Sequence, residues 1–192
     1  DMVMGGRRQV GSTIKPFLYS LAMENGASPC DKAPNVQRTY MVAGRPWTPR
    51  NSNRRRYGQM VTLKWGLAES NNWISAYLMS KLNPRQFVDM LHKFGINNPD
   101  IYPSMALALG PCEVSVGEMV SAYSTFANNG VRIAPLFVTS IEDAEGNVVA
   151  NFEPRMEEVI SSESKNTDCY SMLQLSLTYS FSERCKTCNK ED

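Results

Sequence analysis

The sequence predicts a mixed α+β fold that is mostly helical, with a smaller antiparallel β part. Apolar residues recur at helical spacing in several segments between residues 12 and 127. The pattern then changes to two short strands within residues 136–152, separated by a polar, glycine-containing turn. Hydrophobic residues make up 42% of the 192 residues and charged residues 20%, which is a normal balance for a globular core.

The first helix is expected to begin near Ser12 and to end near Glu24. Pro16 is compatible only with the first turn of a helix, because the backbone N–H groups there have no helical partner. Asn25-Gly26 then supplies the residues that commonly end a helix. The buried side of this helix is predicted by four apolar residues at helical spacing, Ile14, Phe17, Leu18 and Leu21.

A long loop and three more helices are expected next. Residues 27–58 contain four prolines, which predicts an irregular connection with one short strand at 38–42. A connection of this length is usually functional or disordered. The helices that follow are predicted at 61–69, 73–82 and 85–94, and Gly95 ends the last of them.

The last predicted helix begins at Ser115, where Ser115 and Glu118 have the spacing of a capping box. Its predicted apolar face consists of Met119, Val120, Tyr123 and Phe126, and Asn129-Gly130 ends it. Residues 136–141 and 148–152 are then expected to form a β-hairpin around the turn at 143–147.

The net charge and the length of the apolar stretches argue against several classes of protein. The net charge of +1 gives no electrostatic reason to expect a nucleic-acid or membrane-surface partner. The basic run Arg54-Arg55-Arg56 is either solvated loop charge or a contact to an anionic substrate. No apolar stretch approaches the roughly 18 residues of a membrane-spanning helix.

The histidine and cysteine content limits the chemistry. His92 is the only histidine and is expected on a helix surface, so neither a Ser-His-Asp triad nor a two-histidine metalloprotease site is supported. Cys185 and Cys188 form one C-x-x-C pair, whereas a zinc ribbon needs two such pairs. We therefore expect no metal or redox site.

Ser12-Thr13-Ile14-Lys15 is the strongest candidate for a catalytic group. Residues three apart at a helix start lie on one face, so the Lys15 amine can reach the Ser12 hydroxyl. A serine hydroxyl needs a base, and a lysine can be that base when burial or nearby positive charge lowers its pKa. Gly11 allows a substrate to approach the serine closely.

The stretch GRRQVGSTIKPFLYSLAMENG resembles the nucleophile helix of penicillin-binding proteins, especially the bifunctional class that also carries a glycosyltransferase. The resemblance makes Ser12 the nucleophile and Lys15 its base. Ser70-Asn71-Asn72, in the frame TLKWGLAESNNWISAYL, is similar to the S-x-N motif of the same family. It implies that Ser70 relays protons and that Asn72 binds the substrate amide. Further blocks of similarity extend the resemblance over about residues 5–160.

The resemblance implies the α+β transpeptidase fold shared with serine β-lactamases, represented here mostly by its helical subdomain with an incomplete antiparallel sheet. It implies a serine D,D-transpeptidase that cross-links peptidoglycan at the D-Ala-D-Ala end of a stem peptide. β-Lactam antibiotics would be its other ligands, and no cofactor is needed. Such proteins face the outside of the bacterial cytoplasmic membrane, in the periplasm or cell envelope, where the parent protein is anchored.

The chain departs from the family at the third motif, K-T-G. Lys186 and Thr187 are the nearest match and are followed by Cys188 in place of glycine; by resemblance they would bind the substrate. We therefore expect a partial transpeptidase domain at 1–160 and a divergent tail, frame-shifted or truncated, at 161–192. Two alternatives remain open: a β-lactamase or β-lactam sensor, and a catalytically incompetent fragment.

Overall fold

The computed structural model describes residues 1–52 and 54–160. The tail expected at 161–192, with Lys186 and Thr187, lies outside the described residues. The helical elements are η1 (Gly11–Ile14), α1 (Lys15–Glu24), α2 (Leu63–Ala68), α3 (Asn72–Met79), α4 (Pro84–Lys93), η2 (Met105–Leu109) and α5 (Val116–Ala127). In this part of the chain, none of the helices combines the length and the apolar character needed to cross a bilayer.

The strands form five small antiparallel pairs rather than one large sheet in the described residues. Their bounds are β1 (Arg7–Gln9), β2 (Lys32–Pro34), β3 (Tyr40–Val42), β4 (Arg45–Trp47), β5 (Met60–Thr62), β6 (Glu113–Ser115), β7 (Val131–Ile133), β8 (Ser140–Glu142), β9 (Val148–Asn151) and β10 (Met156–Glu158). The pairs are β1–β6, β2–β5, β3–β4, β7–β10 and β8–β9. The predicted α+β class with incomplete sheet is confirmed.

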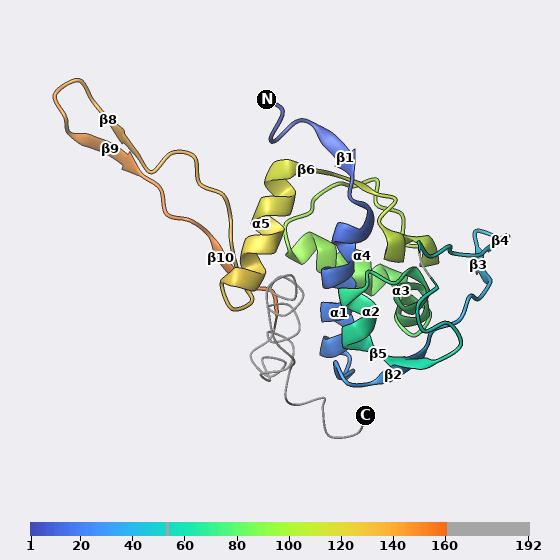
Figure 1. The fold of residues 1–192 in the computed structure, drawn as a ribbon. Coiled ribbons are helices and arrows are strands. Elements are labelled where there is room, and N and C mark those ends of the chain that lie inside the picture. The colour runs from blue at the N-terminus through green and yellow to red at the C-terminus, as the bar shows by residue number, and fades with distance from the viewer. Residues whose placement is uncertain (53, 161–192) are drawn as a thin grey trace.

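Helix α1 lies in the middle of the helical body, next to α2, α3 and α4 (Figure 1). The four predicted core residues of this region, Ile14, Phe17, Leu18 and Leu21, are all buried. Burial extends round the helix, because Tyr19, Ser20, Ala22 and Met23 are buried as well. The helix therefore forms the central element of the core, as expected for one that is enclosed by neighbours.

An aromatic cluster joins α1 to the helices beside it. The ring of Phe17 lies 4.9 Å from that of Phe94 and 5.3 Å from those of Tyr123 and Phe126. The contacts with Phe94 and Tyr123 are edge-to-face, and contacts of this kind stabilise a core beyond the burial of apolar area. The cluster fixes the end of α4 and the C-terminal half of α5 against α1, the helix that follows Ser12.

Helix α5 begins with the predicted capping box between Ser115 and Glu118. Its predicted apolar face is partly wrong, because Val120 is 64% exposed. The buried face is instead centred on Ala122, Thr125 and Phe126. Small residues occupy most of this face, so a count of large apolar side chains placed its centre too far round the helix.

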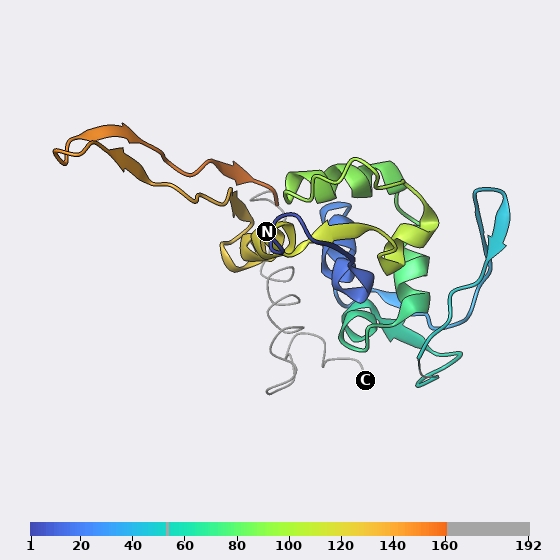
Figure 2. The same ribbon diagram turned by 90° about the horizontal axis from the view of Figure 1, so that it is seen from above.

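The region expected to be an irregular loop contains three short strands. Strand β2 pairs with β5, and β3 pairs with β4 in a hairpin; the strand predicted at 38–42 is observed as Tyr40–Val42. The predicted hairpin near the end of the described chain is β8–β9. The β3–β4 and β8–β9 hairpins project from opposite sides of the helical body (Figures 1 and 2).

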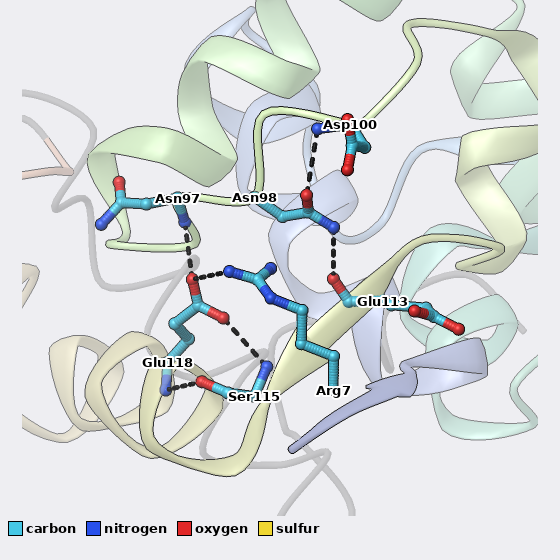
Figure 3. A network of polar contacts seen from close by, with 7 residues as sticks. All are labelled: Arg7, Asn97, Asn98, Asp100, Glu113, Ser115 and Glu118. Carbon is cyan, nitrogen blue, oxygen red and sulfur yellow. Dashed lines mark hydrogen bonds and ion pairs between the residues drawn. The ribbon is translucent and has the colours of Figure 1, made fainter. Parts of the chain in front are cut away.

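A polar network ties β1 to the start of α5 (Figure 3). One Glu118 oxygen accepts from the Ser115 amide at 2.9 Å and the other from the Asn97 amide at 3.0 Å. The Arg7 guanidinium lies 3.7 Å from the same carboxylate. Burial alone would raise the pKa of Glu118, but these hydrogen bonds and the Arg7 charge hold it below its ordinary value. The network connects three segments that are distant in sequence.

Candidate active site

Ser12 lies in η1, directly before α1, and its side chain is exposed. The backbone before it is held by a hydrogen bond from Gly11 N to Gly110 O at 2.9 Å. Both glycines have positive φ, +54° and +69°, a region that favours glycine. A Cβ on Gly110 would overlap the Gly11 carbonyl and lie 2.7 Å from Gly11 N. The approach of these two glycines therefore sets the position of Ser12.

The backbone just after Ser12 is held from the other side. The Tyr123 hydroxyl donates to the carbonyl oxygen of Thr13 at 2.7 Å. Thr13 Oγ1 donates to the carbonyl oxygen of Val10, also at 2.7 Å. Anchors from α5 and from the segment after η2 thus fix both sides of the exposed serine.

Lys15 is the first residue of α1, and its side chain is buried, with 1% of the residue exposed. Its Nζ donates to Ser70 O at 2.6 Å and to Asn72 Oδ1 at 2.7 Å, and it lies 3.0 Å from Ser70 Oγ. Burial lowers the pKa of Lys15 from 10.5 to about 8. In the part of the chain that the structure describes, we find no hydrogen bond between Ser12 and this amine.

The three groups in contact with Lys15 Nζ differ in whether they can donate a hydrogen bond as well as accept one. The Ser70 carbonyl and the Asn72 amide oxygen can only accept, whereas the Ser70 hydroxyl can accept or donate. An ammonium can donate to all three. A neutral amine can donate to the two obligate acceptors and receive the Ser70 hydroxyl proton in its lone pair. The arrangement therefore allows a proton to pass between Lys15 and Ser70 in either direction.

Ser70 lies in the turn between α2 and α3 and is exposed. Its φ of +50° places a non-glycine residue in the left-handed region. Such a conformation is unfavourable and persists where surrounding contacts enforce it. Here Ser70 N donates to Leu67 O at 2.9 Å and Asn71 N to Gly66 O at 2.8 Å. The turn presents both the carbonyl and the hydroxyl of Ser70 to Lys15.

Asn72 is the first residue of α3, and three of its groups are already bonded. Its Oδ1 accepts from Lys15, its Nδ2 donates to Arg50 O at 2.7 Å, and its backbone N–H donates to Asn51 Oδ1 at 2.6 Å. An amide nitrogen carries two hydrogens. Among the described residues, one N–H of Asn72 therefore has no partner and is left to bind an acceptor on a substrate.

Of the sequence-predicted site residues, Lys15, Ser70 and Asn72 are in direct contact, and Ser12 lies one turn before Lys15. The contributions of Arg50 and Asn51 were missed by sequence reasoning. Their signals were a place in a proline-containing segment and in one of the further blocks of family similarity ahead of S-x-N. Within residues 1–52 and 54–160, the structure holds no group of three acidic, histidine or cysteine side chains arranged to bind a metal ion.

Comparisons with known proteins agree on one family. The chain matches the family described as penicillin binding protein transpeptidase domain over residues 2–174. It is 34% identical over 155 residues to penicillin-binding protein 1A of Aquifex aeolicus, which covers 80% of this chain and 21% of that protein. This chain thus spans about one fifth of the length of that curated relative.

Solved structures give the same result. Penicillin-binding protein 1A from Haemophilus influenzae has a TM-score of 0.73 at 30% identity, with 81% of this chain and 23% of that chain covered. PonA1 from Mycobacterium tuberculosis has a TM-score of 0.76 at 24% identity, with 94% and 49% covered, a likeness of fold alone.

Proposed function

Because this chain belongs to the penicillin-binding protein transpeptidase domain family, we propose that it carries the nucleophile and proton-transfer groups of a peptidoglycan D,D-transpeptidase. The observation that carries the proposal is the contact of Lys15 Nζ with both Ser70 and Asn72. This contact joins two separate motifs, because Ser70 and Asn72 lie 55 and 57 residues after Lys15. Ser12, which is exposed and lies three residues before Lys15, is the proposed nucleophile.

In the proposed acylation, Ser12 Oγ attacks the carbonyl carbon between the two D-alanines of a stem peptide. The neutral Lys15 amine takes the hydroxyl proton as the bond forms. A pKa of about 8 supports this role, because a useful fraction of the amine is then neutral near physiological pH. An unperturbed lysine would be almost wholly protonated there.

Collapse of the tetrahedral intermediate breaks the C–N bond, and the departing nitrogen needs a proton. The Ser70 hydroxyl, 3.0 Å from Lys15 Nζ, is the proposed relay for that proton. The unused N–H of Asn72 is the proposed donor to the amide carbonyl of the substrate backbone. D-Alanine leaves, and the acyl group remains on Ser12 until an amine of a neighbouring strand attacks it.

A β-lactam would enter the same cycle. Attack by Ser12 on the ring carbonyl opens the ring and leaves the amine tethered to the acyl group, so the acyl-enzyme persists. Stem peptides and β-lactams are thus the proposed ligands, and the cell envelope, outside the cytoplasmic membrane, is the proposed site of action. The Lys186-Thr187 pair is proposed only as the nearest sequence equivalent of the third motif.

The test is labelling with a fluorescent penicillin, followed by mass spectrometry of the labelled peptide. Residues 5–160 are placed into the Aquifex relative in place of its matching segment, so that the remainder of a transpeptidase domain is present. We expect label on Ser12, none in Ser12→Ala, and normal labelling in Ser80→Ala, whose exposed hydroxyl bonds to Tyr77 O and to the Tyr40 side chain, neither of which is a site residue. Label on another residue would refute the assignment.

A second candidate is a segment that has the fold but not the activity. It is favoured by the sequence itself, which contains no K-T-G and only Lys186-Thr187-Cys188 in its place. An oxyanion donor typically contributes about 10²–10³ in rate, and the family draws one from that strand. The 192-residue chain is then expected to label slowly or not at all while the chimera labels quickly. Turnover of a chromogenic cephalosporin by either protein would instead indicate a β-lactamase.

A further inference from the structure

The turn that carries Ser70 is connected to a buried pair of amide side chains, Asn35 and Asn71. Asn35 is fully buried and Asn71 is 3% exposed. Asn71 Nδ2 donates to Asn35 Oδ1 at 2.9 Å. The two residues are 36 apart in the sequence, and Asn71 is the central residue of the S-x-N motif.

The surroundings of Asn35 allow one orientation of its amide. Its Nδ2 donates to two backbone carbonyls, Arg55 O at 2.8 Å and Arg56 O at 2.9 Å. A flipped amide would place Oδ1 against both of these acceptors. The oxygen must therefore face Asn71, which must present its nitrogen in turn.

That orientation directs the other end of Asn71. Its Oδ1 accepts from Trp73 N at 2.9 Å and Ile74 N at 3.1 Å, and it thereby caps α3. Asn71 thus has two separable functions: a helix cap, which a serine can also provide, and a link to Asn35, which a serine is too short to make.

We infer that the Asn35–Asn71 pair is a positioning device that holds Ser70 in its left-handed conformation and keeps the segment around Arg55 and Arg56 against the catalytic turn. The unfavourable φ of Ser70 must be enforced by surrounding contacts. Asn71, the next residue, provides them, because its backbone N–H and carbonyl and both polar atoms of its side chain are hydrogen-bonded. Asn35 and Asn71 are positioning residues in this account, because neither contacts the reacting atoms. The catalytic consequence rests on the function proposed above.

The link also determines the surroundings of Lys15. Ser70 supplies its carbonyl and hydroxyl to Lys15 Nζ, and Asn72 supplies Oδ1. If the turn relaxes, water reaches the amine and the effect of burial on its pKa declines. The pKa of Lys15 should then rise toward 10.5.

The test is Asn71→Ser in the full chain, with Asn83→Ser as its matched control. Asn83 caps α4 through a bond to Arg85 N and has no part in the link. Two quantities are measured: the pH midpoint of the Lys15 ¹³Cε resonance, and amide hydrogen exchange at residues 70–74. Neither requires acylation, so failure of the link is separable from failure of the proposed function.

We expect Asn71→Ser to raise the Lys15 midpoint by about half a unit or more and to speed exchange at 70–72 by roughly tenfold, the size expected for loss of one buried hydrogen bond. Asn83→Ser should change neither. Equal behaviour of the two variants would overturn the inference. If Asn71→Ser does not fold, hydrogen exchange of the native chain tests the inference instead. Hydrogen exchange should occur as one unit at the backbone amides of Asn35, Asn71 and Gly58, whose N–H donates to Asn35 O at 3.0 Å. Much faster exchange at Asn71 than at Asn35 would contradict the link.

Discussion

The amine of Lys15 lies 2.7 Å from the side-chain oxygen of Asn72, a residue 57 positions later in the chain. This contact connects the first residue of α1 to the first residue of α3. No carboxylate takes part in it, so Lys15 is buried without a counter-ion among the three groups that it contacts. A buried lysine in neutral surroundings favours its uncharged form.

The first prediction is a rise in stability with pH. Because the pKa of Lys15 is about 8 in the folded chain and 10.5 when unperturbed, the unfolded state binds more protons between these values. The free energy of unfolding should therefore increase above pH 8, by up to a few kcal/mol. Urea titrations at pH 7 to 10 measure it.

Tyrosines limit the window in which this rise can be seen. Burial raises the pKa of Tyr123 to about 12, and that of Tyr19 is also raised. These phenols bind more protons in the folded state above about pH 10, so they lower the stability there. Lys15→Met should remove the rise between pH 8 and 10. A variant with the same rise as the native chain would show that Lys15 is not its source.

The second prediction concerns Gly110→Ala. An added methyl group would overlap the Gly11 carbonyl, and the backbone before Ser12 would have to move. We expect a loss of stability of about 1–3 kcal/mol, and a larger proportional loss of Ser12 acylation in the chimera. Thermal unfolding and penicillin labelling measure the two effects.

Gly146→Ala is the matched control for this change. Gly146 also has positive φ, +86°, but a Cβ there meets nothing within 4 Å. It should therefore show the backbone strain without displacement of Ser12, and its labelling rate should be unchanged. If both variants label equally slowly, the contact between the two glycines does not position the serine.

The third prediction tests the aromatic cluster. Phe17→Ala removes a fully buried ring that touches Phe94, Tyr123 and Phe126. The expected cost is about 3–5 kcal/mol of unfolding free energy. Phe137→Ala, at a side chain that is 77% exposed, should cost little. Similar values for both variants would mean that Phe17 is not part of a packed core.

Local chemistry explains which parts of the site could be predicted. Ser12 and Lys15 lie on one helical turn, and Ser70 and Asn72 lie at a junction between two helices, so each pair is visible within a few residues. The end of α4 and the start of α5 were predictable for the same reason, since capping residues act on their immediate neighbours. The helix predicted to start at residue 61 begins only at Leu63, after β5, and the one predicted to end at residue 82 ends at Met79.

Long-range contacts explain what could not be predicted. The pairing of β1 with β6 and of β2 with β5 joins segments of only three residues each, which carry little periodic signal. Asn35 and Asn51 acquire their partners only when the segment that follows β4 folds onto the S-x-N turn. An isolated asparagine in a proline-rich stretch reads as a turn residue, and nothing nearby distinguishes one that is buried and fully bonded.

The last prediction concerns acid stability and the network in Figure 3. The pKa of Glu118 is held below its ordinary value, so its ionised form stabilises the fold at pH above 4.5, and this contribution is lost as the pH falls through the lower folded value. Glu118→Gln keeps an acceptor oxygen but loses the charge near Arg7 and weakens the bonds to Ser115 and Asn97.

At neutral pH the variant should be less stable by about 1 kcal/mol, the usual size of a capping or charge-assisted contribution. The difference from the native chain should shrink as the pH falls below 4, because protonation neutralises the native carboxylate too. Glu142→Gln, on the exposed β8–β9 hairpin, provides the comparison and should show no such difference at any pH. Urea unfolding between pH 3 and 7 measures both. A Glu118→Gln difference that stays constant across this range would mean that the charge is not what stabilises the start of α5, and that the network acts through the neutral hydrogen bonds alone.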